Sequence, residues 1–375
     1  MFNSYPVSAP TLNGNERKYV MDCVDSTWIS SKGGYIDRFE EELATFCHAK
    51  HAIVCSSGTT ALHLALMAYD VQPGDEVMVP TLTFVATANA VTYCGAVPVF
   101  VDVDPVTWNM DAALVEAKIT PRTKGIIPVH LYGHPADMDP ILTIARRHGL
   151  FVVEDAAEAI GAQYRGQSVG SIGNAAIFSF FGNKIITTGE GGAVTTNDDT
   201  IAAKVRLLRD QGMDRAKRYW YPTIGYNYRM TNVQAAIGCA QLERISWHIE
   251  QRTRVAKLYT EFLNECQDVM LPREREWAKS VSWMFSIVLQ FGSEVSRDSM
   301  QNRLAEVGIE TRPFFYPMHR LPPYAHLHEN SEFPVANRIS TRGLNLPTYA
   351  ALRREDIDYI SGQVKDVVSE LSQSE

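Results

Sequence analysis

Short apolar runs alternate with segments of helical spacing along the first half of the chain. Five runs have the length and β-branched content of buried strands, at residues 51–55, 76–79, 97–101, 125–131 and 150–153. Apolar residues recur with helical spacing at residues 16–26, 35–47, 61–67, 84–93, 112–117 and 138–148. Strands that alternate with helices form a mostly parallel sheet that helices cover on both faces. The pattern therefore predicts an α/β fold.

The two ends of the chain have different patterns. Pro6, Pro10 and Gly14 break any helix near the N-terminus and predict an extended arm. After a long helical pattern over residues 232–263, the composition shifts near Pro272 and a smaller set of elements follows. In this last part we expect strands and helices at residues 284–289, 299–307, 310–312 and 355–371. The sequence thus predicts three parts, which are an N-terminal arm (1–15), a large domain (16–250) and a small α+β domain (251–375).

Charge and cysteine usage narrow the class of protein. The chain has a formal net charge of −8 and a pI near 5.7, which argues against nucleic acid or an anionic membrane surface as a partner. The cysteines have no CxxC spacing and no paired histidines, so we expect reduced thiols and no metal site. No stretch has the length of a membrane span, and the first residues lack the pattern of a secretory signal. We therefore expect a cytoplasmic protein.

One lysine stands between two apolar runs without charged neighbours. The run 175–181 ends at Gly182-Asn183, Lys184 follows, and Gly189 to Gly192 precede the next strand-like run. Burial among Phe, Ile and Thr disfavours an ammonium, so the pKa of Lys184 should fall. A neutral amine forms a Schiff base with a carbonyl. The alternative is a lysine whose stem packs on apolar surface while its amine reaches water.

A second motif lies between a predicted strand and a predicted helix. In Ser57-Gly58-Thr59-Thr60, the glycine lets backbone N–H groups approach a ligand, and the helix N-terminus favours an anion. The motif predicts a phosphate site, although Ser and Thr also cap helices without any ligand. Because strands of a parallel sheet carry their site at the carboxyl ends, we expect this turn, Asp155 and Lys184 on one edge.

Two acids and an aromatic complete the pattern. Asp155 ends an apolar strand, where it needs a cationic partner such as a protonated pyridine nitrogen, and Glu158 follows it three residues later. The alternative for Asp155 is an acid at a helix N-terminus. Phe84 follows a strand end and either stacks on a planar ring or belongs to the core. A phosphate cradle, an aromatic, an acid and a desolvated lysine are together what pyridoxal 5'-phosphate (PLP) requires.

These motifs resemble a known family along nearly the whole chain. The segments that carry the resemblance are residues 57–62, 154–158, 179–184, 189–192 and 227–230. They are similar to the DegT/DnrJ/EryC1/StrS nucleotide-sugar aminotransferases. The resemblance implies the type I PLP-dependent aminotransferase fold, resembling aspartate aminotransferase, and a homodimer with shared active sites.

The same resemblance implies roles for individual residues. It implies that Lys184 holds PLP as the internal aldimine and that Asp155 faces the pyridine nitrogen. Glu158 would lie near the ring hydroxyl, and Phe84 would stack on the ring. The phosphate would be held by Ser179 and the Gly58-Thr59 turn, with Asn227 contributed by the other subunit.

Other segments resemble one subgroup of the family, which makes GDP-perosamine. They are residues 25–31, 130–133, 179–184 and 312–319. This likeness implies transfer of an amino group from L-glutamate to C4 of GDP-4-keto-6-deoxy-D-mannose, and the retained lysine favours transamination over dehydration. It implies substrate contacts from Trp28, Ser30, His130, Arg229, Tyr316 and His319. The alternatives are a 4-aminotransferase for a UDP- or dTDP-linked keto sugar and a family member without activity that serves as a regulatory subunit.

Overall fold

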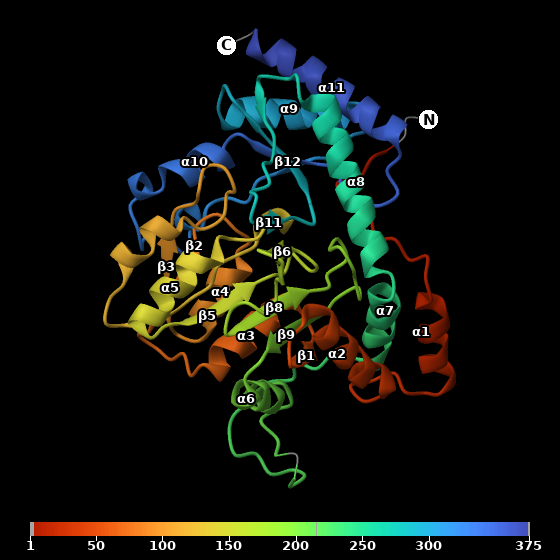
Figure 1. Cartoon of the computed structure of the whole chain (residues 1–375), viewed down its shortest axis with the longest axis vertical. Coiled ribbons are helices and arrows are strands. Elements are labelled where there is room, and N and C mark those ends of the chain that lie inside the picture. Colours follow the sequence, from red (N-terminus) through yellow and green to blue (C-terminus); the bar gives the residue numbers. More distant parts are fainter. Residues whose placement is uncertain (1–3, 215, 374–375) are drawn as a thin grey trace.

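A mixed seven-stranded sheet forms the centre of the computed structural model, which describes residues 4–214 and 216–373. Its strands are β1 (His51–Cys55), β2 (Glu76–Pro80), β3 (Val97–Val101), β4 (Thr123–Ile126), β5 (Phe151–Asp155), β8 (Ala175–Ser179) and β9 (Gly192–Thr196). Their order is β1-β9-β8-β5-β4-β2-β3, and β9 alone runs antiparallel to its neighbours within this sheet. The predicted, mostly parallel α/β sheet is confirmed (Figure 1).

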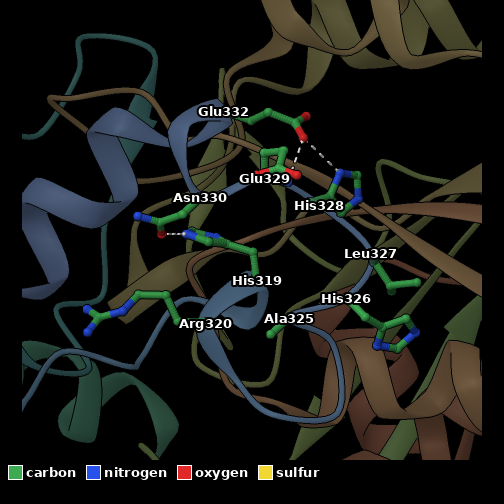
Figure 2. A pocket seen from close by; sticks show the side chains of 9 residues that line it. All are labelled: His319, Arg320, Ala325, His326, Leu327, His328, Glu329, Asn330 and Glu332. Carbon is green, nitrogen blue, oxygen red and sulfur yellow. Dashed lines mark hydrogen bonds and ion pairs between the residues drawn. The ribbon is translucent and has the colours of Figure 1, made fainter.

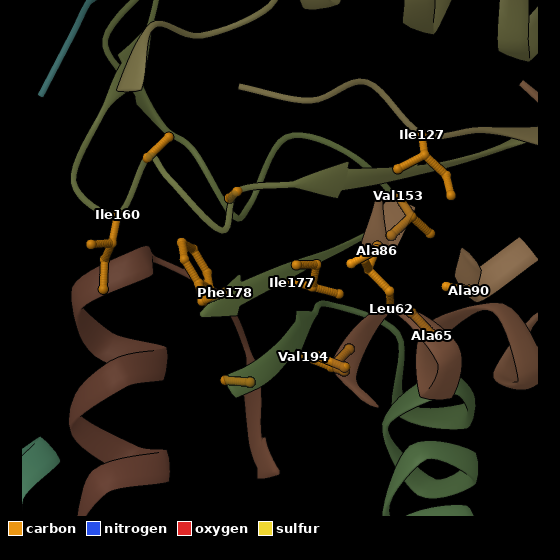
Figure 3. Packing of buried hydrophobic residues seen from close by; sticks show 14 of the residues in the cluster. Leu62, Ala65, Ala86, Ala90, Ile127, Val153, Ile160, Ile177, Phe178 and Val194 are labelled. Carbon is orange, nitrogen blue, oxygen red and sulfur yellow. The ribbon is translucent and has the colours of Figure 1, made fainter. Parts of the chain in front are cut away.

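Helices pack on both faces of this sheet. The helices of this part are α1 (Glu16–Asp25), α2 (Gly34–Cys47), α3 (Gly58–Ala68), α4 (Ala86–Tyr93), α5 (Met138–His148), α6 (Asp199–Arg209) and α7 (Asn232–Leu242). Leu62 of α3 lies against Ile177 and Val194 of the sheet, whereas the next residue of β8, Phe178, points to the opposite face (Figure 3). On that opposite face α2 packs through Phe39, whose ring lies 5.2 Å from that of Phe180.

The C-terminal part adds a second, smaller sheet. It contains α8 (Ile245–Leu263), α9 (Glu294–Glu306), α10 (Pro334–Ser340) and α11 (Arg354–Ser372), and strands β10 (Val269–Met270), β12 (Phe285–Leu289), β13 (Arg312–Pro313) and β14 (Gly343–Leu346). The four strands pair antiparallel in the order β10-β12-β14-β13. Tyr259 of α8 stacks on Phe285 of β12 at 4.9 Å, so α8 runs from the large sheet into this second core (Figure 1).

Two further contacts join the C-terminal part to the rest of the chain. A short sheet pairs β11 (Ala278–Lys279) with β6 (Gln163–Tyr164), which pairs in turn with β7 (Gln167–Ser168). The N-terminal arm lies against the C-terminal part, because Tyr5 bridges Ile309 and the N–H of Thr348 donates to the carbonyl of Val7 at 2.9 Å. The division into an arm and two domains remains a prediction, and its boundary at residue 250 falls inside α8.

Several predicted elements differ from the structure. The helix predicted at 112–117 is two separate 3-10 turns, at Ala112–Leu114 and Glu116–Lys118. The single helix predicted over 232–263 is broken at Glu243-Arg244 into α7 and α8. The strand predicted at 125–131 ends at Ile126, before Pro128, which has no N–H for a sheet hydrogen bond. Within residues 4–214 and 216–373, no helix is long and apolar enough to cross a membrane.

Candidate active site

The carboxyl ends of β1, β5 and β8 open into one cavity of about 410 Å³. Most of the residues predicted to hold a cofactor line this cavity, namely Gly58, Thr59, Phe84, Asp155, Glu158, Ser179 and Lys184. They lie apart in the sequence and meet because parallel strands end at the same edge of the sheet. The expected common edge is therefore present as a single site.

Lys184 reaches into this cavity from the loop after β8. Its Nζ lies 3.9 Å from the centre of the Trp283 ring and 3.6 Å from Oε1 of Glu158. Burial lowers the pKa of the Lys184 amine, and the carboxylates of Glu158 and Asp155 oppose this shift without reversing it. The amine is thus biased toward the neutral form that attacks a carbonyl.

Asp155 ends β5 with its carboxylate buried in the wall of the cavity. The hydroxyl of Thr87 donates to Oδ2 at 2.8 Å, and the N–H of Ala157 donates to Oδ1 at 3.2 Å. Burial raises the pKa of Asp155, while these two donors lower it. A protonated heteroaromatic nitrogen that enters the cavity would supply the cation that this carboxylate needs.

Glu158 lies between the lysine and the next rim loop. The N–H of Tyr132 donates to its Oε2 at 2.8 Å. Burial raises the pKa of Glu158 to about 7, so the side chain is close to half-protonated at neutral pH. A carboxyl of this kind both accepts a hydrogen bond and exchanges a proton with a neighbouring group.

The opposite end of the cavity is a turn that admits only small residues. A Cβ on Gly58 would lie 2.8 Å from Cβ of Ser179, too close for two carbon atoms. Ser57 caps α3 by accepting from the N–H of Thr60, which leaves the first N–H groups of the helix for a ligand. The Ser179 hydroxyl lines the same end of the cavity. This arrangement suits a phosphate group.

The C-terminal part closes the cavity with residues that the sequence had not singled out individually. Trp283, Arg312 and Asn345 line the wall opposite the large sheet, and Phe315 lies 5.8 Å from the ring of Phe84. Phe84 itself is 54% exposed, so its ring is open to a planar ligand. Arg312 and Phe315 belong to the run 312–319 noted above, but nothing in the sequence placed them opposite Lys184.

His130 is placed differently from the expectation. Its side chain has no exposed surface. Its Nδ1 accepts from the N–H of Ala136 at 3.0 Å, so Nε2 carries the proton and donates to Oε2 of Glu154 at 3.1 Å. Because both ring nitrogens have partners inside the protein, the geometry does not favour a substrate contact.

His319 lies in another pocket, an open one of about 700 Å³ (Figure 2). Its Nδ1 lies 2.6 Å from the hydroxyl of Thr81, and its Nε2 lies 3.0 Å from the side-chain oxygen of Asn330. The ring stacks on Phe333 at 4.2 Å, which is the pattern of a structural histidine. Tyr316 is 46% exposed and does not line the cavity of Lys184.

The remaining predicted contacts also lie outside that cavity in this chain. Asn227 accepts from Nε of Arg229 at 3.0 Å, and Arg229 pairs with Asp210 at 2.9 Å. Trp28 is 57% exposed, and the carbonyl of Ser30 accepts from the N–H of Asn232. Their roles stay predictions. No group of metal-ligating side chains is found within the described ranges 4–214 and 216–373.

Comparison with known proteins identifies the family. The DegT/DnrJ/EryC1/StrS aminotransferase family matches residues 10–365. GDP-perosamine synthase of Caulobacter vibrioides is 56% identical over 96% of this chain and 98% of that protein. The protein of the same name from Escherichia coli O157:H7 is 46% identical, over 97% of this chain and 99% of that protein.

A solved structure agrees with the sequence comparison. Spr1654 of Streptococcus pneumoniae, described as a sugar aminotransferase in its PLP form, is 28% identical with a TM-score of 0.94. The match covers 98% of this chain and 100% of that one, and it confirms the expected type I aminotransferase fold. The chain therefore belongs to the DegT/DnrJ/EryC1/StrS aminotransferase family.

Proposed function

We propose that this chain transfers the amino group of glutamate to C4 of GDP-4-keto-6-deoxy-D-mannose and so makes GDP-perosamine, with PLP as cofactor. The observation that carries the proposal is the 56% identity to a GDP-perosamine synthase over nearly the whole length of both proteins. The cavity supports it, because Lys184, Asp155 and the Gly58 turn lie together as PLP chemistry needs.

The residues of the cavity fit the cofactor at each end. The Asp155 carboxylate is buried, and no ion pair within residues 4–214 and 216–373 includes it, which suits a pyridinium N–H. The turn at Gly58 and the hydroxyl of Ser179 would hold the phosphate, and Phe84 would cover the ring. When bound, PLP supplies an aldehyde for amines and a ring that withdraws electrons from the reacting carbon.

Within this arrangement Lys184 handles the protons. Burial biases its amine toward the neutral form, and in that form Nζ removes the proton from the α-carbon of glutamate in the first half-reaction. In the second half-reaction the ammonium form of Nζ delivers a proton to C4 of the sugar and returns to the neutral amine. Glu158 lies 3.6 Å from Nζ and holds the amine near the cavity wall between these steps.

The lysine provides the first test. Lys184→Ala should remove the visible absorbance of the lysine-linked cofactor and reduce turnover by several orders of magnitude, because both proton transfers depend on Nζ. Absorbance spectra and product formation from glutamate and the GDP-keto sugar measure the two effects. A variant that still cycles between donor and ketone would rule out this role of Lys184.

The nucleotide needs a separate test with unmodified protein. GDP-, UDP- and dTDP-linked 4-keto-6-deoxy sugars are compared at equal concentration, with glutamate as donor. We expect kcat/KM to be at least tenfold higher for the GDP sugar. A preference for a UDP or dTDP sugar would contradict the proposed substrate while leaving the aminotransferase activity intact.

We also propose a homodimer with shared active sites that works in the cytoplasm. Large apolar side chains are exposed on two segments, at Trp28, Ile29, Tyr219, Trp220, Tyr221 and Ile224, and such surfaces suit a second copy. Asn227 and Arg229 lie outside the cavity of their own chain, which leaves them available to a partner. The six cysteines are free thiols, as in proteins of a reducing compartment.

A further inference from the structure

Arg252 on α8 is a buried cation whose acceptors are all backbone carbonyls. The residue is 3% exposed, and none of the ion pairs in the described part of the chain includes it. Its guanidinium donates to the carbonyl of Trp283 at 2.7 Å, to that of Thr348, and to that of Lys184 at 3.4 Å. Arg252 thus joins the lysine loop to two segments of the C-terminal part.

A buried charge without a carboxylate partner is unusual and costs free energy. Burial lowers the pKa of Arg252 to about 10, so the guanidinium remains charged at neutral pH. A glutamine at this position could donate to some of the same carbonyls without the cost of burying a charge. A lysine could also donate to some of them through a shorter side chain. The position of Arg252 therefore requires an explanation beyond satisfying carbonyl groups.

The neighbouring carbonyl of the same loop, that of Asn183, is also held by hydrogen bonds. Nε1 of Trp283 donates to the carbonyl of Asn183 at 2.8 Å, and the hydroxyl of Ser8 donates to that carbonyl at 3.2 Å. The ring of Trp283 also lies 3.9 Å from Nζ of Lys184. Arg252 and Trp283 together hold two consecutive carbonyls of the loop that carries the lysine (Figure 1 shows α8 passing from the large sheet to the small one).

We propose that Arg252 is a positioning residue for Lys184, holding its backbone against Trp283 and placing a fixed positive charge at the backbone carbonyl of the lysine. The inference rests on the proposed function, since it assigns Arg252 to the chemistry of Lys184. It differs from a purely structural role because it requires both the charge and the donor geometry of Arg252.

The groups that face Lys184 determine the sign of the effect. Glu158 and Asp155 favour a protonated amine, whereas burial and the charge of Arg252 disfavour it. Removing that charge should therefore raise the pKa of Lys184 and reduce the fraction of neutral amine at neutral pH. If the pKa of Lys184 rose by one unit in a variant without this charge, the neutral fraction of its amine would fall about tenfold. This holds at any pH below the pKa of Lys184 in both the unmodified protein and the variant.

The test measures the reactivity of Lys184 directly. The full chain is loaded with pyridoxamine 5'-phosphate, which leaves the amine free, and is labelled with trace acetic anhydride between pH 6 and 10. Mass spectrometry gives the labelling rate of Lys184 at each pH. Arg252→Met should move the midpoint to higher pH and lower the labelling rate at pH 7 by at least about twofold.

Two matched variants separate charge from geometry. Arg252→Lys keeps a positive charge but loses the planar group, so its midpoint should stay near that of the unmodified protein while kcat falls at unchanged donor KM. Arg254→Met is the control, since Arg254 lies on the same helix and donates to the carbonyl of Leu352 at 2.6 Å, outside the Lys184 cavity. It should change neither measurement.

Each outcome of these measurements supports or overturns the positioning role of Arg252. A folded Arg252→Met protein with an unchanged midpoint would overturn the proposal whatever its kcat, because a fall in kcat alone is what a purely structural role predicts. If that variant does not fold, Arg252→Lys and Trp283→Phe decide, and unchanged kcat in both would equally reject the positioning role. The labelling needs no sugar nucleotide, so a wrong substrate assignment would leave this result interpretable.

Discussion

Glu158 is a carboxyl group whose burial makes the stability of the cofactor-free chain depend on pH. Its pKa is raised from 4.5 to about 7. Protonated Glu158 stabilises the folded chain fully below pH 4.5, and this stabilisation is lost as the pH rises through about 7. The reason is that Glu158 ionises at a lower pH in the unfolded chain than in the folded one. Glu158→Gln should abolish this loss, which amounts to at most about 3 kcal/mol.

Denaturant unfolding at pH 5, 6 and 7 measures the difference between the two proteins. Asp155 has a raised pKa as well and is present in both proteins, so the difference reports Glu158 together with its electrostatic coupling to Asp155. Glu41→Gln, on the exposed side of α2, is the control and should run parallel to the unmodified protein. Parallel curves for Glu158→Gln would show that the carboxyl is not desolvated in solution.

Individual residues could be predicted where local sequence decides their surroundings. Lys184 stands among apolar neighbours, so its entry into an apolar cavity follows from the sequence. His130 and His319 also lie in segments near this edge of the sheet, but their rings are held by partners that are distant in the sequence, Glu154 and Thr81 among them. Tertiary packing decides which ring faces a ligand, and a single sequence does not contain that information.

At the scale of elements, the N-terminus of α3 depends on the absence of a side chain at Gly58. Its backbone lies outside the left-handed region, so alanine costs space and not backbone strain. A Cβ 2.8 Å from Cβ of Ser179 forces the helix start and β8 apart. Overpacking of this kind costs about 1–3 kcal/mol, so Gly58→Ala should weaken PLP binding tenfold to a hundredfold.

Titration of the cofactor-free protein with PLP, followed by absorbance, gives this affinity. Ser179→Gly combined with Gly58→Ala should relieve the crowding and recover part of the lost PLP affinity. The recovery should be incomplete, because the hydroxyl of Ser179 is then missing from the phosphate site. Gly182→Ala is the matched control, because a Cβ there meets no atom within 4 Å. Equal affinities for Gly58→Ala and Gly182→Ala would contradict a phosphate site at this turn.

Whole elements were predictable where a run of apolar residues, or a helical spacing of them, is uninterrupted. β1, β2, β3 and α5 lie where the pattern placed them. The break between α7 and α8 was not predicted, since Glu243-Arg244 contains neither the Gly nor the Pro that marks a helix end in a sequence. The short strands β10, β11, β13 and β14 were missed or shortened because two to four residues give no clear period.

At the scale of the whole molecule, the cavity is assembled from both ends of the chain. Trp283 and Arg312 close it from the C-terminal part, and Ser8 of the arm holds the carbonyl of Asn183 beside Lys184. Asn227 does not reach the cavity of its own chain, although its role as a phosphate contact is part of the proposed dimer. The dimer can therefore be tested by separating the two contributions onto different subunits.

Two inactive variants should complement each other if active sites are shared. Lys184→Ala removes the amine, and Asn227→Asp places a negative charge opposite the phosphate of the partner's site. Asn227→Asp should fold normally, because Arg229 already donates to this side chain at 3.0 Å and favours a carboxylate there. In a mixed dimer one site carries both changes and the other carries neither. Random exchange of equal amounts makes half of the dimers mixed, which restores about a quarter of full activity.

Mixing the purified variants under conditions of subunit exchange, followed by the amino-transfer assay, measures this recovery. If each site were built within one chain, every site in the mixture would keep one defect and activity would stay at the level of the separate variants. Asn227→Ala with Lys184→Ala is the companion pair, since it removes the contact without adding charge. Its mixed dimers should contribute the same quarter of full activity, added to the residual activity of the Asn227→Ala homodimers. Recovery in both pairs requires Asn227 and Lys184 to serve one site from two subunits, which is a geometry that no single chain can provide.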